Sequence, residues 1–169
     1  MSDLNDRLDL LDRILSRNIQ WIGSADSKAV FLFAVDSAML GVLATLIPSM
    51  RAWTIASGIV TSIASLLLLS SVICVVFVNF PRLHGPRNSL VYFGGISAYD
   101  ESKYVEKVLQ GVSEELLQDF ARQCHRNAEI SQVKYKFIKN ATIFAFVAFP
   151  FWIVAISLLY QLKLPLIEP

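Results

Sequence analysis

The ionisable residue in the most unusual surroundings is Asp36, the one charged residue between Ala29 and Pro48. An aspartate at the centre of a lone membrane helix costs about 2.5–3.5 kcal/mol, so its carboxyl group should face a partner or a cavity, or carry a proton. Two interpretations are open. Asp36 lines an oligomeric pore or controls helix packing, or a protonated Asp36 is hydrogen-bonded to a hydroxyl of the next apolar segment, such as Thr61 or Ser62.

A second set of residues combines aromatic rings, cations and an amide, which are groups that can hold a nucleotide. A ring can stack on the base, and Arg or Lys can bind the phosphate. The candidate ligand-binding residues are Asp26, Lys28, Tyr92, Phe93, Arg122, Gln123, Lys134 and Tyr135. For Tyr135 and the neighbouring Lys139, the alternative is that they anchor a helix at the membrane surface.

Motifs for catalysis and for metal binding are missing from the sequence. It contains no P-loop, no G-x-G-x-x-G after a strand and no HExxH. His84 and His125 are the only histidines, and no pair of Cys or His residues stands at the spacing of a zinc site. Cys124 and His125 cannot act together on a helix, because adjacent side chains point about 100° apart. We therefore expect a protein that is not an enzyme and that uses no metal and no cofactor.

The composition shows which elements must position these residues. Apolar types make up 54% of the 169 residues and charged types 17%, against about 45–50% and about 25% in soluble domains. The excess lies in three runs, 29–48, 53–80 and 141–162, of 20, 28 and 22 residues. About 20 apolar residues cross a bilayer as a helix. The sequence predicts an all-α membrane protein with three transmembrane helices, and excludes a disordered chain, a disulfide scaffold and a soluble enzyme with a large core.

The positions of the basic residues predict the topology. Of the 15 Lys and Arg residues, four precede the first span and nine lie between the second and the third. Basic residues near spans stay on the cytoplasmic side. We expect a cytoplasmic N-terminus, a cytoplasmic helical region at 81–140, and a short external tail at 163–169.

The first 27 residues are expected to form a cytoplasmic amphipathic helix that is separate from the transmembrane hairpin at 28–80. Apolar residues and one Asn recur at alternating spacings of four and three: Leu4, Leu8, Leu11, Leu15, Asn18 and Ile22. These are the a and d positions of a heptad repeat, and they form a seam along which one helix packs against another. The helix either packs on its own chain or self-associates with Asn18 fixing the register. The segment Gly23–Ser27 is predicted to break it.

The four residues 49–52 between the first two spans force an antiparallel helix pair. Small residues stand four apart on the second span: Ser57, Thr61 and Ser65, and also Gly58 and Ser62. Such spacing lets helices approach closely in lipid. These residues are used either within the hairpin or between subunits.

The region between the second and third spans begins with a loop, PRLHGPRNS, followed by LVYF, for which a strand or a membrane-surface contact is expected. Ser97 is predicted to cap a helix that ends at Gly111. Ser113 should cap a helix that continues without a stop signal to Gln161, about 73 Å long. Pro150 should kink this helix.

Three segments resemble the transmembrane effectors of the Pycsar family: SADSKAVFLFAVDSAMLGVL, SLVYFGGIS, and QCHRNAEISQVKYKFIKNA leading into the last span. The resemblance covers residues 8–162. The shared polar and aromatic points are Asp26, Lys28, Phe93, Gly94, Gln123, Lys134 and Tyr135. At position 36 the resemblance leads us to expect Asn where this chain has Asp.

The resemblance implies an effector of bacterial antiphage defence in the inner membrane. A pyrimidine nucleotide cyclase would supply cCMP or cUMP as the ligand, and the effector would then impair the membrane. Its partners would be the lipid bilayer, the cyclic pyrimidine nucleotide, the cyclase and further copies of itself, with no nucleic acid. Two alternatives stay open: a related small membrane effector that answers another nucleotide signal, and a structural membrane protein without a signal.

Overall fold

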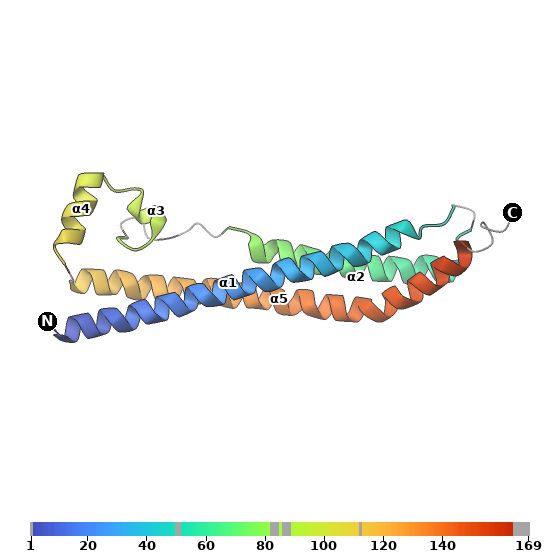
Figure 1. The fold of residues 1–169 in the computed structure, drawn as a ribbon, viewed down its shortest axis with the longest axis horizontal. Coiled ribbons are helices and arrows are strands. Elements are labelled where there is room, and N and C mark those ends of the chain that lie inside the picture. The colour runs from blue at the N-terminus through green and yellow to red at the C-terminus, as the bar shows by residue number, and fades with distance from the viewer. Residues whose placement is uncertain (1, 50–51, 82–84, 86–88, 112, 164–169) are drawn as a thin grey trace. The chain divides into compact units, whose positions relative to one another are not determined.

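The structure is a computed structural model that describes residues 2–49, 52–81, 85, 89–111 and 113–163. In these residues there are five helices and no strand: α1 (Ser2–Thr45), α2 (Ile55–Asn79), α3 (Phe93–Ile96), α4 (Glu101–Leu109) and α5 (Glu114–Lys163) (Figure 1). The strand considered for LVYF is wrong, because Phe93 begins α3 instead. His84, the rest of 82–84 and 86–88, and positions 164–169 of the predicted tail lie outside the described residues.

The chain divides into two compact units. The loop unit contains Met1–Ala25 and Phe80–Lys134, and the span unit contains Asp26–Asn79 and Tyr135–Pro169. Helices α1 and α5 each continue from one unit into the other without an interruption. The third predicted span is therefore one helix with the segment before it, which confirms the uninterrupted helix expected from Ser113 onward.

The predicted break at Gly23–Ser27 is wrong, because α1 passes through it. A glycine inside a helix costs only about 1 kcal/mol relative to alanine, and no proline follows it. Ala25 and Ala29 are fully buried and continue the spacing of the residues before them. Packing of these alanines outweighs the weak helix propensity of the segment.

The buried residues of the long helices follow one spacing, alternately four and three residues. On α1 they are Leu15, Asn18, Ala25, Ala29, Asp36, Met39 and Leu43; on α2 they are Ser57, Ala64, Leu68, Ser71, Val75 and Val78. On α5 the same spacing relates Leu117, Cys124, Asn127, Ser131, Lys134, Ile138, Ala141, Ala148, Ala155 and Leu159. This pattern is typical of helices that pack lengthwise at small crossing angles.

In the loop unit, the predicted seam of α1 packs on its own chain. The Asn18 side-chain amide donates a hydrogen bond of 2.9 Å to the carbonyl oxygen of Cys124, and Asn18 is 3% exposed. This contact corresponds to the first interpretation of the helix, packing on its own chain.

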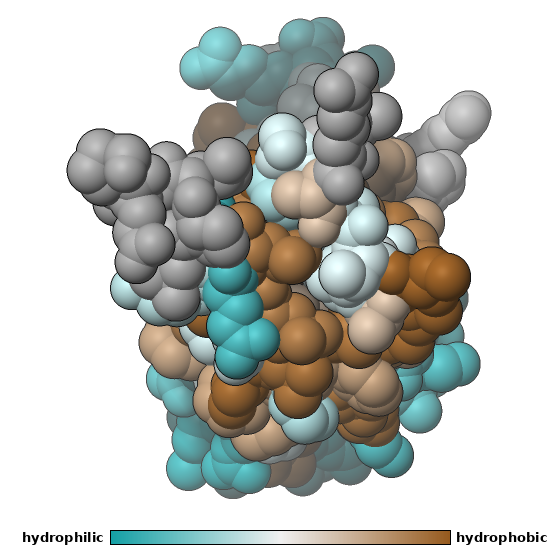
Figure 2. Space-filling model, turned by 90° about the vertical axis from the view of Figure 1, so that its right-hand side faces the viewer, coloured by the Kyte–Doolittle hydropathy of each residue, from teal (hydrophilic) through white to brown (hydrophobic). Residues whose placement is uncertain are grey.

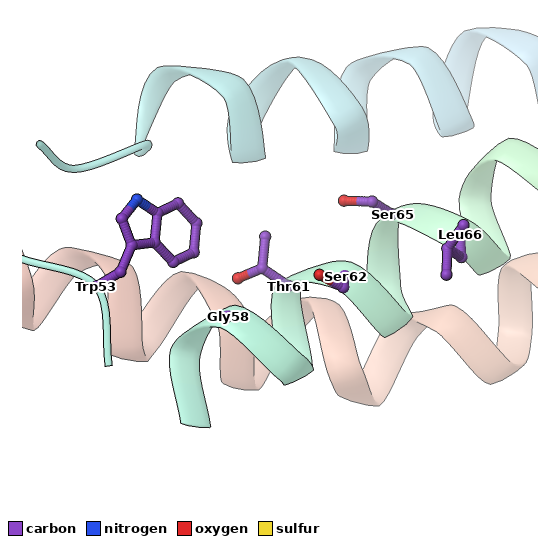
Figure 3. Close-up of a pocket in the computed structure, with 6 residues that line it drawn as sticks. All are labelled: Trp53, Gly58, Thr61, Ser62, Ser65 and Leu66. Atoms are coloured by element: carbon purple, nitrogen blue, oxygen red, sulfur yellow. The ribbon is translucent and has the colours of Figure 1, made fainter. Parts of the chain in front are cut away.

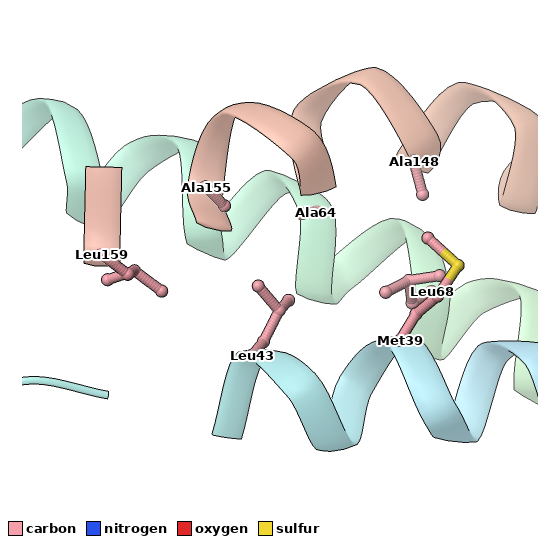
Figure 4. Close-up of a cluster of buried hydrophobic side chains, with 7 residues drawn as sticks. All are labelled: Met39, Leu43, Ala64, Leu68, Ala148, Ala155 and Leu159. Carbon is pink, nitrogen blue, oxygen red and sulfur yellow. The ribbon is translucent and has the colours of Figure 1, made fainter. Parts of the chain in front are cut away.

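In the span unit, α1, α2 and α5 share one core, formed by Met39, Leu43, Ala64, Leu68, Ala148, Ala155 and Leu159 (Figure 4). The alanines let the helix backbones approach closely. The indole nitrogen of Trp152 donates a hydrogen bond of 2.9 Å to the carbonyl oxygen of Met39. The ammonium of Lys163 donates one of 2.6 Å to the carbonyl oxygen of Thr45. The core is therefore fixed between α1 and α5 by hydrogen bonds as well as by packing.

The outer surface of the span unit is apolar. Phe31, Ile55, Leu66 and Phe146 are each more than half exposed, and apolar side chains cover much of the surface seen in Figure 2. Of the described residues, three helices are long and apolar enough to cross a membrane: Asp3–Thr45, Ile55–Asn79 and Glu114–Lys163. A surface of this kind is typical of contact with lipid.

Helix ends follow local side-chain chemistry. The Ser113 hydroxyl accepts the N–H of Leu116 at 3.2 Å, which confirms the predicted cap of α5. Gly111 follows α4 with φ +81°, as a helix end at glycine requires. The prediction for Ser97 is wrong: its hydroxyl donates to the carbonyl oxygen of Gly94 at the end of α3, and α4 begins only at Glu101.

Pro150 lies inside α5 without ending it. Figure 1 shows the helix changing direction in its final third, the part that contains Pro150. A proline removes one backbone hydrogen bond and bends a helix at this place.

The continuity of α1 gives a direct prediction for Gly23→Ala. A Cβ at position 23 meets no atom within 4 Å, so alanine should raise the free energy of unfolding by about 0.5–1 kcal/mol through helix propensity. Thermal unfolding of the detergent-solubilised protein, followed by helical circular dichroism, measures this change. A clear loss of stability would mean that the chain is not helical at position 23.

Candidate ligand-binding site

The loop before α3 is fixed by a carboxylate on α5. Asp119 Oδ2 accepts the hydroxyl of Ser89 at 2.9 Å and the N–H of Leu90 at 2.7 Å. The Ser89 oxygen in turn accepts the N–H groups of Val91 at 3.1 Å and Tyr92 at 2.7 Å. Because Ser89 is 1% exposed, these bonds are shielded from water. They give Tyr92 and Phe93 a defined place in the loop unit.

Glycines surround the Tyr92 ring and the turn that carries it. A Cβ on Gly94 would lie 2.6 Å from the ring and one on Gly85 2.4 Å from it. A Cβ on Gly95 would lie 2.7 Å from both the backbone nitrogen and the backbone oxygen of Ser89. The ring of Phe93 lies 4.7 Å from that of Tyr92, but Phe93 is 64% exposed. The loop therefore presents the Phe93 ring to solvent.

The α5 residues of the loop unit point in opposite directions. Arg122 is exposed, whereas Gln123 and Lys134 are both 9% exposed. The Gln123 amide nitrogen donates to Asn127 Oδ1 at 3.4 Å, and among the described residues Gln123 Oε1 has no hydrogen-bond partner although it is buried. A ligand in solvent can reach Arg122 directly, but Gln123 only if the packing opens.

In the span unit, the predicted residues Lys28 and Tyr135 come together. The Lys28 ammonium lies 5.1 Å from the centre of the Tyr135 ring, which is a cation–π distance. Two residues after Tyr135, the ring of Phe137 stacks on that of Phe77, with centres 5.3 Å apart. Asp26, also in the span unit, is half-buried. The predicted site residues thus fall into two groups: Asp26, Lys28 and Tyr135 in the span unit, and the remaining five in the loop unit.

Asp36 is fully buried in the span unit. The Ser71 hydroxyl oxygen lies 2.6 Å from Asp36 Oδ2 and 3.0 Å from the carbonyl oxygen of Ala141. The structure thus places Asp36 against a hydroxyl of α2, but not against Thr61 or Ser62 as expected.

The helix register explains why Ser71 is the partner. Leu43 and Ala64 share the core, and α1 and α2 run antiparallel. Asp36 lies seven residues before Leu43, and Ser71 lies seven residues after Ala64. Thr61 and Ser62 lie on the other side of Ala64, and each is between two and three turns away from the level of Ser71.

A hollow of about 510 Å³ lies along α2 and is lined by Trp53, Gly58, Thr61, Ser62, Ser65 and Leu66 (Figure 3). Within the described part of the chain, the buried Thr61 hydroxyl has no hydrogen-bond partner. The small residues predicted to pack closely therefore border an open space in this chain. Ser57 is the exception: it is fully buried, and its oxygen accepts the N–H of Thr54 at the start of α2.

Comparison with known protein families decides the kind of protein. Residues 10–161 match the model of the Pycsar effector protein domain. The chain belongs to the Pycsar effector family. None of the curated proteins and none of the solved structures with which it was compared matches it.

Membership of this family makes the chain an antiphage defence effector, in a system that has a cyclic nucleotide signal and a cyclase. The match includes all eight candidate ligand-binding residues and Asp36. Within the described residues, no group of three His, Cys, Asp or Glu side chains is arranged to hold a metal ion.

Three residues of this Pycsar effector hold the loop before α3 or the buried Asp36 in place, and for two of them, Asp119 and Ser71, the sequence gives no signal. Asp119 lies on an ordinary polar face of α5, and Ser71 is one of several hydroxyl residues on α2. Only Ser89 carried a local signal, because a serine often accepts the N–H groups of the residues two and three positions later. Contacts between distant segments supplied the other two.

The loop geometry predicts the effect of Gly95→Ala. The new Cβ would collide with the Ser89 backbone, and overpacking of this kind costs about 1–3 kcal/mol. Chymotrypsin should then cut at Tyr92 and Phe93 about tenfold faster, since cleavage follows the population of the open loop. Gly23→Ala is the matched control with an unchanged rate at these sites. Equal rates for Gly95→Ala and the wild type would show that the close contact at Ser89 is absent.

The surroundings of Cys124 predict slow alkylation. Burial raises the pKa of the Cys124 thiol, and the negative charge of Asp12 raises the pKa further. Less thiolate is present at neutral pH, so in a Cys74→Ala background iodoacetamide should react slowly and the rate should rise with pH. Asp12→Asn should speed the reaction several-fold at pH 7.5, as measured by mass spectrometry. A rate unaffected by this substitution would contradict the arrangement of α1 and α5 in the loop unit.

Proposed function

We propose that this Pycsar effector binds cCMP or cUMP on the cytoplasmic side and then impairs the bacterial inner membrane through a rearrangement of its spans. The observation that carries the proposal is the continuity of α1 and α5 through both units. A ligand that displaces either helix in the loop unit acts on the spans through the same helix. Such a ligand must bind the active arrangement more tightly than the resting one.

The loop unit is the proposed cytoplasmic part. The basic residues of the chain are concentrated before the first span and between the second and third, and such residues stay in the cytoplasm. The N-terminus then faces the cytoplasm and the C-terminus lies outside.

The chemistry of the ligand fits groups in the loop unit. A pyrimidine base can stack on the exposed Phe93 ring, and stacking of this kind contributes about 1–3 kcal/mol per base. Arg122 can pair with the cyclic phosphate. Once the packing around Gln123 opens, its amide offers both a donor and an acceptor to the edge of the base. In the span unit, Lys28 over Tyr135 separately combines a cation with an aromatic ring.

Membrane impairment requires more than one copy of the chain in this proposal. The centre of the span unit is filled by the core around Leu68 and Ala148, so a single bundle leaves no path for ions. A conducting or disrupted arrangement therefore arises between copies in a homo-oligomer, surrounded by lipid. The chain acts as a switch on the membrane and not as an enzyme.

Liposomes of bacterial lipids that contain the purified full chain and a trapped dye test the proposal. Addition of cCMP or cUMP should release the dye, whereas cAMP and cyclic oligonucleotides should not. Release by a cyclic oligonucleotide alone would instead favour an effector with another nucleotide signal. No release with any nucleotide would contradict membrane impairment and favour a structural membrane protein.

The same liposomes test the ligand contacts. Phe93→Ala and Arg122→Ala should each raise the nucleotide concentration for half-maximal release about tenfold, since each removes about 1–3 kcal/mol of binding. Arg13→Ala is the matched control, because Arg13 is exposed and, in the part of the chain that the structure describes, bonds only to the carbonyl oxygen of Asp9 in its own helix. Equal responses of Arg122→Ala and Arg13→Ala would remove Arg122 from the site.

A further inference from the structure

The hydroxyl of Ser71 has one hydrogen and two oxygen neighbours. Its oxygen lies 2.6 Å from Asp36 Oδ2 and 3.0 Å from the carbonyl oxygen of Ala141. A carbonyl oxygen only accepts hydrogen bonds, and an ionised carboxylate also only accepts. One hydroxyl hydrogen cannot serve both.

A second hydrogen satisfies both contacts. If Asp36 is a carboxylic acid, its O–H donates to the Ser71 oxygen, and the Ser71 O–H then donates to Ala141. A distance of 2.6 Å fits a carboxylic acid donor and a carboxylate acceptor alike, so the number of hydrogens decides. We infer that Asp36 is a proton-binding site in the spans, and that its proton completes a hydrogen-bond chain from α1 through α2 to α5.

The other oxygen of Asp36 supports the same assignment. Asp36 is fully buried, and among the described residues Oδ1 has no hydrogen-bond partner. An unpaired neutral carbonyl oxygen costs about 1–3 kcal/mol, whereas a buried carboxylate without a counter-ion costs several kcal/mol more. The neutral acid therefore has the lower free energy at this position.

The helices around Asp36 offer it no positive partner. On α2, no charged residue occurs in Ile55–Asn79, and the one titratable group of this helix is the thiol of Cys74. On α1, the ammonium of Lys28 lies over the Tyr135 ring. On α5, Lys136 and Lys139 are exposed.

The consequence is that the hydrogen-bond chain Asp36–Ser71–Ala141, called the tie below, links three helices at one level of the spans. Asp36 belongs to α1, Ser71 to α2 and Ala141 to α5, and all three residues are fully buried. Ionisation of Asp36 removes one donor from the chain and leaves a buried charge. The proton therefore stabilises the packed arrangement of the spans.

Infrared spectroscopy of the full chain in lipid vesicles at pH 7.5 tests for the proton. The wild type should show the carbonyl stretch of a protonated carboxyl group, and Asp36→Asn should lack it. The difference between the two spectra isolates this residue from the other carboxylates. A difference spectrum that contains only carboxylate bands overturns the inference.

Unfolding of the detergent-solubilised protein tests the tie independently of any nucleotide. Hydrogen bonds between membrane helices contribute about 0.6–1.7 kcal/mol. Ser71→Ala should therefore raise the unfolding equilibrium constant by about 3-fold to about 18-fold. Ser70→Ala is the matched control, because among the described residues Ser70 bonds only within its own helix, to the carbonyl oxygen of Leu66. Equal effects of the two substitutions overturn the tie.

Two substitutions at position 36 distinguish the effect of the hydrogen-bond donor from the effect of the side-chain volume. Asp36→Asn keeps an N–H donor and should remain close to the wild type, whereas Asp36→Leu should destabilise the protein and should reduce the effect of Ser71→Ala to the loss of the Ser71–Ala141 bond. Destabilisation by Asn equal to that by Leu contradicts the donor role. Dye release plays no part in these measurements, so failure of the tie and failure of the proposed function are distinguishable.

Discussion

Lengthwise packing of α1, α2 and α5 at spacings of four and three residues is the constraint on which the rest of the structure depends. The fully buried residues of these helices all follow this spacing, whether they are polar or apolar. Buried polar groups must find hydrogen-bond partners. Asn18 reaches a carbonyl of α5, and Asp36 reaches Ser71. The same spacing thus fixes the core and the places where polar chemistry occurs inside it.

Continuity of the two long helices gives this packing its functional meaning. Proteins in which a soluble domain is joined to spans by a flexible linker can lose the signal in the linker. Here α1 and α5 carry their seams from the loop unit into the span unit. The loop that presents Phe93 is bonded to Asp119 of α5 itself. A ligand at this loop therefore bears on a helix that also forms a span.

Sequence reasoning was sufficient where local chemistry decides the structure. The helix cap at Ser113, the glycine at position 111 and the seam through Leu15 and Asn18 all depend on near neighbours. It failed at Gly23–Ser27, where burial of Ala25 and Ala29 outweighs propensity. It also missed Ser71 and Asp119, since their partners lie 35 and 30 residues away. The register between distant helices decides those contacts, and a single sequence does not reveal it.

The most direct test of the central claim is amide hydrogen exchange at residues 23–27 of the full chain in liposomes, with and without cUMP. If α1 is continuous, these amides should be protected as strongly as those of the adjoining turns of α1, and cUMP should change protection in both units. Exchange at 23–27 as fast as in an unstructured peptide would contradict this continuity, because the loop unit and the spans would then be joined by a flexible segment in α1.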